Sequence, residues 1–428
     1  MRSGAIYQIF PDRFARDESV AADRDLVAWD SVPTPQNFFG GNLRGITQRL
    51  EYIAELGITN IYFNPIFSAH SNHRYDAHSY MEIDPLLGTK EDFRELVTKA
   101  KSLGVGVIID GVFNHVGDHY PDFVAAQNGD KKLAKHFFLY EDGSYQTFGS
   151  AQSLPKLNLE NADVLKHIAD VMKYWDSFGI AGWRFDVPYK VSNKVWKKLR
   201  KMTRGIASAQ FIVAEAWTDW TFASSFESVQ NYKTGNRILD YSVLMRADSE
   251  DFILDVVRYA DAWSDGSLLW NFVDSHDTAR YMTRCENDYE AFLIGFALHM
   301  LMPGVPVVYY GTELATPGEN DPGCRTSFPQ VLNHDQEVTL NYTQRWIQMR
   351  QMPALTHGDL VVKELKNHAM VFRRKLGKSK IEVLVNTGYR SELLHSKIDG
   401  TWKSVRHEYV EITGNTVPAR TLVYRVTE

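Results

Sequence analysis

Short runs of β-branched and aromatic residues recur along the chain and predict strands. The eight runs are AIYQIF, ITNIYFNPIF, GVGVIIDGVF, IAGWRFDV, QFIVAEAW, RILDYSVLM, LLWNFVDSHD and GVPVVYYGTE. Between most of them apolar residues return at helical spacing, as in LRGITQRLEYIAELG, KEDFRELVTKAKSLG and ADVLKHIADVMKYWDSFG. Gly57 and Gly104 stand where the first two of these helices should end. Strands that alternate with helices predict a parallel sheet, and eight repeats predict a (β/α)8 barrel, the TIM-barrel fold.

The alternation is interrupted in two places. From 116 to 161 no helix of normal crossover length is visible, and we interpret this segment as a subdomain inserted after the third strand. From Thr356 onward, runs such as AMVFRRKL, IEVLVNT and RTLVYRV are separated by turns. We therefore expect a barrel formed by 1–115 and 162–355, an inserted subdomain at 116–161, and a C-terminal all-β domain, a β-sandwich, at 356–428.

Composition and charge restrict the partners. Hydrophobic residues make up 44% and charged residues 23% of a chain with a net charge of −6, and no long Lys or Arg block occurs. Neither nucleic acid nor a membrane surface is therefore expected as a partner. The two cysteines, Cys285 and Cys324, give no disulfide framework and no metal-ligand spacing. Without a signal-like N-terminus or a long apolar run, we expect a cytoplasmic protein, either a monomer or a homodimer.

Titratable residues follow the strands at the ends where such a barrel carries its active site. They are Asp110 with Asn114 and His115 after the third run, Arg184 and Asp186 in the fourth, Glu215 in the fifth, and His276 with Asp277 in the seventh. Because side chains alternate along a strand, Arg184 and Asp186 should lie on the same side. We expect the guanidinium to lower the pKa of Asp186 and to keep that carboxylate ionised, as a nucleophile requires.

Glu215 lies in an apolar setting, after FIVA and before Ala216 and Trp217. This setting predicts a raised pKa and a general acid. Two carboxyls with opposite pKa shifts are typical of glycoside hydrolysis, and a nucleophile paired with an acid predicts retention through a covalent glycosyl-enzyme. Asp277 would be a third carboxylate that binds substrate hydroxyls and stabilises the developing positive charge.

Each of these residues has a structural alternative when it is taken singly. The pair of Arg184 and Asp186 could be an ion pair that only supports the barrel, and His115 and His276 could be structural histidines. Four such sites in strand order weaken that explanation for the whole set. The aromatic fraction, 13%, is also high, although core packing remains the commoner role of any one ring. The candidates for stacking on sugar rings are Tyr75, Trp217, Trp220 and Phe222.

The segments DGVFNH, GWRFDV, IVAEAW and FVDSHD resemble, in this order, the four signature regions of the α-amylase family of glycoside hydrolases. The similarity extends over about residues 5 to 315. It implies that Asp186 is the nucleophile, Glu215 the acid/base and Asp277 the transition-state stabiliser. It also implies that substrate is bound by His73, Tyr75, Asp110, His115, Arg184, His276 and Arg280.

The motif LPKLN at 154–158 is similar to an additional signature of one branch, which contains cyclomaltodextrinase, neopullulanase and maltogenic amylase. Two features depart from that branch. We expect the chain to lack the N-terminal β domain of the branch, and Tyr189 and Lys190 stand where its members commonly have Asn-Glu. Lys190 is expected to line the acceptor side of the scissile bond, and Trp217 is also expected to bind substrate.

The resemblance leaves a structural Ca²⁺ open, whereas the chemistry itself requires no cofactor. Many relatives bind Ca²⁺ through an Asn equivalent to Asn114, and some bind it in an acidic N-terminal loop. The loop FARDESVAADRD is acidic here, but Asn42 stands where those relatives often have Asp. Oxygen ligands for a hard cation are available, and solvated acidic residues without a metal are an equally good explanation.

The leading expectation is a retaining α-glucan hydrolase that cleaves α-1,4 bonds of maltooligosaccharides, with cyclodextrins, pullulan and starch as further candidate substrates. A 4-α-glucanotransferase is the alternative, because the same covalent intermediate can react with a sugar hydroxyl instead of water. A non-catalytic carbohydrate-binding relative is expected less, since all three carboxylates are present.

Overall fold

Eight parallel strands close into a barrel in a computed structural model that describes residues 4–20, 22, 24–217, 224–263 and 268–427. The strands are β1 (Ala5–Ile9), β2 (Ile58–Phe63), β3 (Gly106–Gly111), β6 (Gly182–Phe185), β7 (Ile212–Ala214), β8 (Ser228–Asn231), β9 (Trp270–Phe272) and β10 (Val305–Tyr309). Their order around the barrel is β1, β10, β9, β8, β7, β6, β3, β2. The predicted (β/α)8 fold is confirmed.

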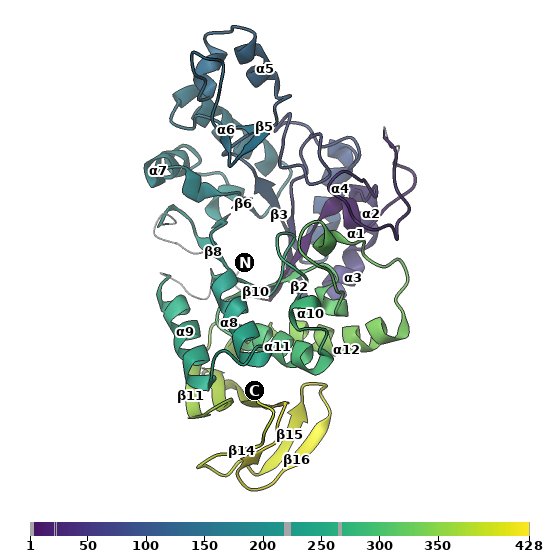
Figure 1. The fold of residues 1–428 in the computed structure, drawn as a ribbon, viewed down its shortest axis with the longest axis vertical. Helices are drawn as coiled ribbons and strands as arrows, with labels where there is room; N and C mark the ends of the chain where they lie inside the picture. Colours follow the sequence, from purple (N-terminus) through teal and green to yellow (C-terminus); the bar gives the residue numbers. More distant parts are fainter. Residues whose placement is uncertain (1–3, 21, 23, 218–223, 264–267, 428) are drawn as a thin grey trace.

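Helices follow the strands and surround the barrel (Figure 1). The longer ones are α2 (Leu43–Gln48), α3 (Leu50–Glu55), α4 (Lys90–Ser102), α6 (Ala162–Asp176), α7 (Asn193–Met202), α8 (Tyr232–Ser242), α9 (Ser249–Asp261), α11 (Tyr289–Leu301) and α12 (His334–Met349). The short ones are α1 (Pro11–Phe14), α5 (Pro121–Gln127), α10 (Tyr281–Arg284), α13 (Pro353–Thr356) and the 3₁₀ turns η1 (Leu133–His136), η2 (Pro188–Lys190), η3 (Ser208–Gln210), η6 (Thr312–Leu314) and η7 (Gly323–Arg325). Gly57 and Gly104 follow α3 and α4 with φ of 90° and 76°, as their role as helix ends requires.

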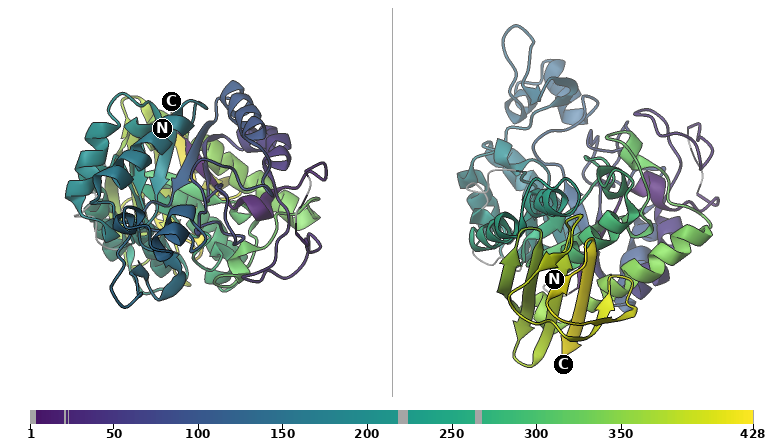
Figure 2. Two further views of the ribbon diagram at one scale, coloured as in Figure 1. Left: turned by 90° about the horizontal axis from the view of Figure 1, so that it is seen from above. Right: turned by 60° about the horizontal axis from the view of Figure 1, so that its bottom comes forward.

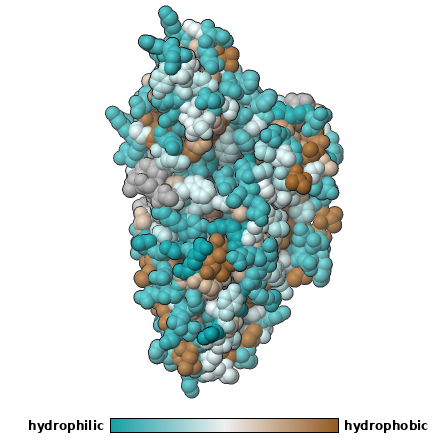
Figure 3. All heavy atoms as spheres, viewed as in Figure 1, coloured by the Kyte–Doolittle hydropathy of each residue, from teal (hydrophilic) through white to brown (hydrophobic). Residues whose placement is uncertain are grey.

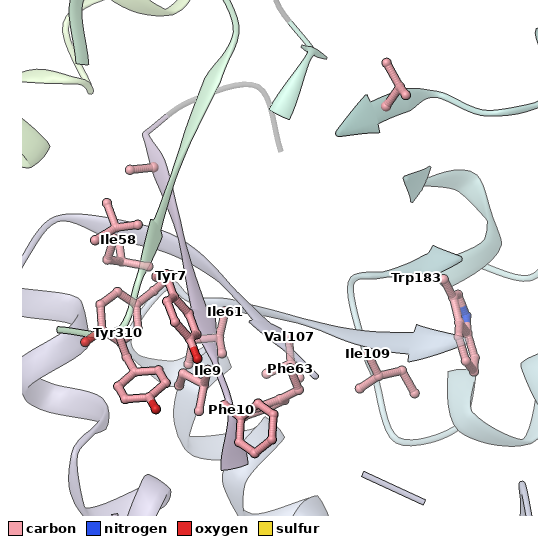
Figure 4. Packing of buried hydrophobic residues seen from close by; sticks show 14 of the residues in the cluster. Tyr7, Ile9, Phe10, Ile58, Ile61, Phe63, Val107, Ile109, Trp183 and Tyr310 are labelled. Carbon is pink, nitrogen blue, oxygen red and sulfur yellow. The ribbon is translucent and has the colours of Figure 1, made fainter. Parts of the chain in front are cut away.

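The alternation of side chains along each strand divides the barrel core into two layers. Ile6, Tyr62 and Ile108 point into the barrel and belong to a small interior cluster. Their neighbours Tyr7 and Ile61 belong instead to the large cluster between the strands and the surrounding helices (Figure 4). Both faces of the strands are thus apolar and buried, which explains why the strands appear in the sequence as continuous apolar runs.

One predicted strand is wrong. The run RILDYSVLM lies mostly in α8, whose buried residues include Ile238, Leu239, Tyr241 and Ser242. This spacing places them on one face of a helix, and the side chain of Asn231 caps that helix by accepting from the Thr234 backbone N–H. The sixth strand is β8, with the sequence SVQN. Sequence reasoning missed it because it is short and because its inward side chains, Ser228 and Gln230, are polar.

The segment expected to form an inserted subdomain lies between β3 and α6 and stands at the top of the molecule in Figure 1. It contains α5, η1 and a hairpin of β4 (Thr147–Phe148) and β5 (Ala151–Pro155). A bridge between His115 and Lys156 joins the hairpin side of this segment to the end of β3. The limits at 116 and 161 stay a prediction, and the hairpin reaches the open end of the barrel.

An antiparallel β domain follows the barrel, as expected. Its main sheet has the order β11 (Asp359–Lys366), β12 (Ala369–Leu376), β13 (Ser379–Asn386), β18 (Thr421–Thr427), β15 (Gly400–Ser404) and β16 (Tyr409–Ile412). A second small sheet pairs β14 (Glu392–Leu393) with β17 (Thr416–Val417). One face of the main sheet, with Phe372 and Val383, joins the core of the barrel side, and the other face packs around Trp402. The right-hand view of Figure 2 shows the strands of this domain in front.

The visible surface is mostly polar, and both cysteines are buried. The face seen in Figure 3 is mostly hydrophilic, and its apolar residues are scattered. Within the described residues, no helix has the length and apolarity that a bilayer crossing demands. Cys285 and Cys324 are both buried and unbonded to each other.

One buried arginine, Arg374, joins the barrel to the β domain, and a second, Arg350, supports the same helix end from the barrel side. Arg374 of β12 donates to the backbone carbonyls of Leu301 (2.6 Å), Leu355 (3.1 Å) and Gly358 (2.9 Å). Arg350 of the barrel side donates to the Met300 carbonyl at 3.1 Å. The carbonyls of Met300 and Leu301 belong to the last turn of α11, where a helix has no internal donors left. The guanidinium groups therefore satisfy a helix end that is buried under the second domain.

Replacing Arg374 by Met should lower the free energy of unfolding by about 3 kcal/mol, because buried carbonyls lose their donors while the apolar volume is largely kept. Urea denaturation followed by circular dichroism measures this. Lys375→Met, at an exposed position of the same strand, should change stability by less than about 0.5 kcal/mol. Equal stabilities for the two variants would show that Arg374 does not hold the domains together.

Candidate active site

A cavity of about 370 Å³ opens at the carboxyl ends of the barrel strands. It is lined by His73, Tyr75, His115, Phe148, Leu154, Asp186, Val187, Tyr189, Glu215, Trp217, His276, Asp277, Asp321 and Arg325. Residues from the loops after β2, β3, β6, β7, β9 and β10 meet there, together with two side chains of the β4–β5 hairpin. Seven of the residues expected from the sequence line this one cavity, in addition to Asp186 itself.

The guanidinium of Arg184 lies at the floor of the cavity and contacts three carboxyls. Asp110 and Arg184 are paired in the register of β3 and β6, and Arg184 Nη1 lies 2.8 Å from Asp110 Oδ2. The same nitrogen donates to Asp186 Oδ1 at 2.8 Å, and Nη2 lies 3.0 Å from Glu215 Oε2. Arg184 is 1% exposed, so these contacts are shielded from water. The expected pairing of Arg184 with Asp186 is confirmed.

Arg184 lowers the pKa of Asp186 as expected, but other causes outweigh it and the net shift is upward. Burial raises the pKa of Asp186 well above its ordinary value, Arg184 opposes this rise, and the charges of Glu215 and Asp110 add to it. Burial is the first cause, and the neighbouring carboxylates add to it because one guanidinium serves all three groups. The net direction is therefore opposite to the one expected from the pair alone.

Glu215 is held by donors on both of its oxygens. Oε1 accepts from the Trp217 indole N–H at 2.9 Å, and Oε2 accepts from the Val187 backbone N–H at 2.9 Å. Val187 has φ of 37° and ψ of 45°, a strained left-handed conformation for a β-branched residue. The Trp217 ring stacks on Tyr232 with 4.1 Å between centroids. The carboxyl therefore has one fixed orientation, 5% exposed to the cavity.

Asp277 is more exposed than the other two carboxyls and has partners on both oxygens. His276 Nε2 lies 3.1 Å from Oδ2, and Arg325 Nη2 lies 3.6 Å from Oδ1. Burial raises the pKa of Asp277 to about 7, the Glu215 charge adds to this, and Arg325 opposes it. Arg325 also pairs with Asp321 at 3.0 Å. Sequence reasoning missed both residues because they lie in a long loop after β10, outside any strand-end pattern.

Tyr75 and His276 form a stacked pair at one wall of the cavity. Their ring centroids are 5.6 Å apart with an interplanar angle of 10°, and Tyr75 Oη lies 2.8 Å from His276 Nε2. The Nδ1 atom of His276 is held by Gln8 at 2.8 Å, and Asn64 donates to Tyr75 Oη at 3.0 Å. These contacts fix an aromatic face of the kind that sugar rings stack on.

The histidines of the cavity are neutral near neutral pH. Burial lowers the pKa of His73 and that of His115 to about 4, and it lowers the pKa of His276 well below its ordinary value. A neutral imidazole offers one donor and one acceptor. His115 Nε2 is buried without a protein partner, and its ring stacks on Phe148 at 4.9 Å. Neither Phe148 nor Leu154 was expected, because nothing in their spacing marks them.

The remaining expected residues lie outside the cavity lining. Arg280 is fully buried behind it, donates to the Tyr310 carbonyl and packs on Tyr309 at 4.1 Å. Lys190 ends η2 and is exposed. Trp220 and Phe222 lie outside the described residues. The proposed roles of these residues in substrate binding stay predictions.

The residues expected near a cation offer few oxygen ligands. Asn114 Oδ1 is buried without a protein partner, and its Nδ2 lies 3.2 Å from His115 Nδ1. The side chain of Asn42 accepts from the Gly45 N–H at 2.9 Å and donates to the Asp17 carbonyl at 2.9 Å, so it closes its loop by hydrogen bonds. Across the described ranges, no three His, Cys, Asp or Glu side chains converge as metal ligands. Ca²⁺ is typically bound by about 6 to 8 oxygens, so a cation at Asn114 would need further oxygens beside this one. The structural Ca²⁺ stays a prediction.

The arrangement suits cleavage of an acetal. Asp186 and Glu215 face one cavity. Asp186 lies beside a guanidinium, and Glu215 is fixed by two N–H donors. Asp277 lines the same cavity and can approach a positive charge that develops between these two carboxyls. Neutral imidazoles and a stacked tyrosine surround the three carboxyls. These are the parts that a double-displacement glycosidase requires.

Comparisons with known proteins agree with this chemistry. The family model "Alpha amylase, catalytic domain" matches residues 8–354. The chain is 33% identical to the maltogenic alpha-amylase of Bacillus acidopullulyticus over 94% of this chain and 72% of that protein. It is 34% identical to a cyclomaltodextrinase of a Bacillus species over 83% of this chain and 66% of that protein. The chain thus spans about two thirds of the length of these curated relatives.

Among solved structures, the ligand-free cyclic alpha-maltosyl-(1→6)-maltose hydrolase of Arthrobacter globiformis is similar over nearly its whole length. It has a TM-score of 0.89 and 31% sequence identity, and the match covers 100% of this chain and 99% of that chain. The similarity therefore includes the barrel, the segment between β3 and α6, and the C-terminal β domain.

Proposed function

The chain belongs to the alpha-amylase family of glycoside hydrolases, and from this premise we propose that it is a retaining hydrolase of α-1,4-linked maltooligosaccharides that works by double displacement. The observation that carries the proposal is the cluster in which Arg184 contacts Asp110, Asp186 and Glu215 at the floor of one cavity. In this proposal Asp186 is the nucleophile and Glu215 the acid/base.

In the first step, a carboxylate oxygen of Asp186 attacks the anomeric carbon, the glycosidic bond breaks, and Glu215 gives its proton to the leaving oxygen. Arg184 orients Asp186, and the N–H groups of Val187 and Trp217 orient Glu215. Asp277 stabilises the positive charge on the sugar, because its carboxylate stands at the same cavity. Tyr75 offers its stacked face to the sugar ring.

In the second step, Glu215 takes a proton from water, the water oxygen attacks the anomeric carbon, and the bond to Asp186 breaks. Two inversions restore the α configuration. A sugar hydroxyl that replaces water at this step would make the protein a 4-α-glucanotransferase. The names of the similar proteins, a maltogenic alpha-amylase, a cyclomaltodextrinase and a cyclic maltosyl-maltose hydrolase, favour hydrolysis and small or cyclic substrates.

A product time course tests this proposal. The substrates are maltotriose, maltoheptaose, β-cyclodextrin, pullulan, soluble starch and cyclic alpha-maltosyl-(1→6)-maltose. We expect new reducing ends, no products longer than the substrate, and the α-anomer as the first product in NMR spectra. Early release of the β-anomer would exclude double displacement, and products longer than the substrate would establish transfer.

Replacing Arg325 by Gln should move the acid limb of the kcat/KM profile to higher pH by about one unit. Burial raises the pKa of Asp277 to about 7, and among the groups that lower this pKa Arg325 has the largest effect. Without that positive charge the carboxyl is protonated at a higher pH, and its stabilising charge is lost sooner as the pH falls. Initial rates on maltoheptaose between pH 4 and pH 9 measure the shift.

The matched control is Arg24→Gln, in a loop remote from the catalytic carboxyls, where Arg24 donates to the His70 carbonyl. This variant should keep the wild-type acid limb. If the acid limb of the kcat/KM profile is also unchanged in the Arg325 variant, the limb belongs to a group other than Asp277.

A further inference from the structure

The segment from Val187 to Lys190 lies on the leaving-group side of the cavity. The Val187 N–H donates to Glu215 Oε2, and Glu215 is the group that protonates the leaving oxygen in the proposed function. Tyr189, two residues further on, lines the same cavity and is 44% exposed. This segment therefore borders the side of the cavity on which a sugar protonated by Glu215 would lie.

A second lysine, Lys156 of the inserted segment, contacts the segment from Val187 to Lys190. Lys156, from the motif LPKLN, extends its Nζ to the backbone carbonyl of Lys190 at 3.3 Å. The ammonium of Lys156 is 5.6 Å from the Phe138 ring centroid, and that of Lys190 is 5.3 Å from the Tyr189 ring centroid. A lysine of the inserted segment thus contacts the turn after β6 that carries Tyr189 and Lys190.

The charge repulsion between the ammonium groups of Lys156 and Lys190 is unfavourable in the absence of a ligand. Burial lowers the pKa of Lys156, the charge of Lys190 lowers it further, and the more distant Glu160 opposes both. Within the part of the chain that the structure describes, neither lysine forms an ion pair with a carboxylate, whereas Lys90, Lys99 and Lys166 do. Two ammonium groups that lie near each other without a paired carboxylate attract an anion.

We propose that Lys156 and Lys190 bind a phosphate monoester on the sugar unit beyond the scissile bond, so that phosphorylated α-glucans are preferred substrates. This inference rests on the proposed function, because it assigns the leaving-group side through the role of Glu215. A phosphate monoester matches the site in charge, since it carries nearly two negative charges at neutral pH. It also matches the site in donors, since one N–H of Lys156 meets the Lys190 carbonyl and the others of the two ammonium groups are available. A neutral sugar hydroxyl uses only one of them.

The comparison that tests the inference uses two matched substrates. The first is a maltodextrin that carries 6-phosphate groups, and the second is the same preparation after treatment with a phosphatase. The kcat/KM ratio of the two is measured for wild type, Lys156→Gln, Lys190→Gln and the double variant, at low and high KCl. Gln keeps a hydrogen-bond donor at each position and removes only the charge. Lys101→Gln, at an exposed position at the far end of α4, is the matched control.

We expect the wild type and the Lys101 variant to prefer the phosphorylated dextrin about tenfold at low salt, the size of a charge-assisted contact. The preference should fall in each single variant, approach one in the double variant, and decrease with added KCl. A wild-type ratio at or below one would overturn the inference. A ratio that the double variant leaves unchanged would overturn it equally.

Failure of the proposed function is recognised separately. Calorimetric binding of the same two dextrins to Glu215→Gln protein gives an affinity ratio that needs no turnover. If wild type cleaves neither dextrin, the proposed function is wrong, and the affinity ratio with and without the lysine substitutions still decides the anion site. If wild type cleaves both dextrins equally well, the function stands and the lysine site is wrong.

Discussion

The Glu215→Gln variant is expected to lose about 10²- to 10⁴-fold in kcat on maltoheptaose and much less on α-maltosyl fluoride. Proton donation to the leaving oxygen limits the first reaction, whereas fluoride leaves without an acid. The expected difference follows from the fixed carboxyl of Glu215, whose two oxygens face the N–H groups of Trp217 and Val187. An amide nitrogen at this position must face one of these donors, so a small loss of thermal stability is expected as well.

Stopped assays on both substrates and a thermal melt measure these effects. Glu227→Gln is the matched control, because Glu227 is a half-buried carboxyl that pairs with Arg200 away from the cavity. It should keep the wild-type ratio of the two activities. Equal losses on both substrates in the Glu215 variant would show that Glu215 is not the acid.

The Asp186→Asn variant is expected to lose at least about 10⁴-fold in kcat on both kinds of substrate, because no leaving group replaces a missing nucleophile. The same variant should be more stable than wild type near neutral pH. Burial raises the pKa of Asp186 well above the value of 3.8 for an unfolded chain. Its contribution to stability is thus fully present below about pH 4 and is lost as the pH rises through the folded pKa, so a neutral Asn removes an unfavourable charge.

Thermal melts of both proteins between pH 4 and pH 8 measure this second effect. The stability gain of the variant should grow with pH. The result also separates the two explanations of the Arg184 and Asp186 pair. A carboxylate that only supports the barrel as an ion pair would make the Asn variant less stable at every pH and leave part of the activity.

The strand pattern was sufficient to predict the position of the main catalytic groups. Arg184 and Asp186 differ by two positions in one strand, so a common side follows from the geometry of any strand. Glu215 and Asp277 follow strands that end at the same face of the barrel. This part of the site is local in the sequence, and local reasoning was enough to find it.

Other parts depend on contacts between distant segments. Arg325 reaches Asp277 from a loop 48 residues away in the chain, and Phe148 reaches His115 from the β4–β5 hairpin. The pKa of Asp186 was predicted in the wrong direction because its burial, the first cause of the rise, depends on the whole barrel. The sequence also shows one carboxylate beside Arg184, whereas in space there are three.

The strand β8 shows a second limit. Its inward residues Ser228 and Gln230 are polar, so the strand has no apolar run in the sequence. The neighbouring helix α8 does have an apolar run, and that run resembles the pattern of a strand. Only the closed barrel distinguishes them, because closure requires a strand between β7 and β9 and leaves no other segment for it.

The buried carbonyl contacts of Arg374 have a consequence for the history of the gene. A domain that is exchanged between proteins by recombination must keep its own core and expose a tolerant boundary. Here the donor, Arg374, lies in β12, and its acceptors are the carbonyls of Leu301 and Leu355 on the barrel side. A recombination boundary near residue 356 would therefore separate the guanidinium from both carbonyls. The barrel and the β domain should therefore have been inherited together, and chimeras that join this barrel to another C-terminal domain should need a donor at the position of Arg374.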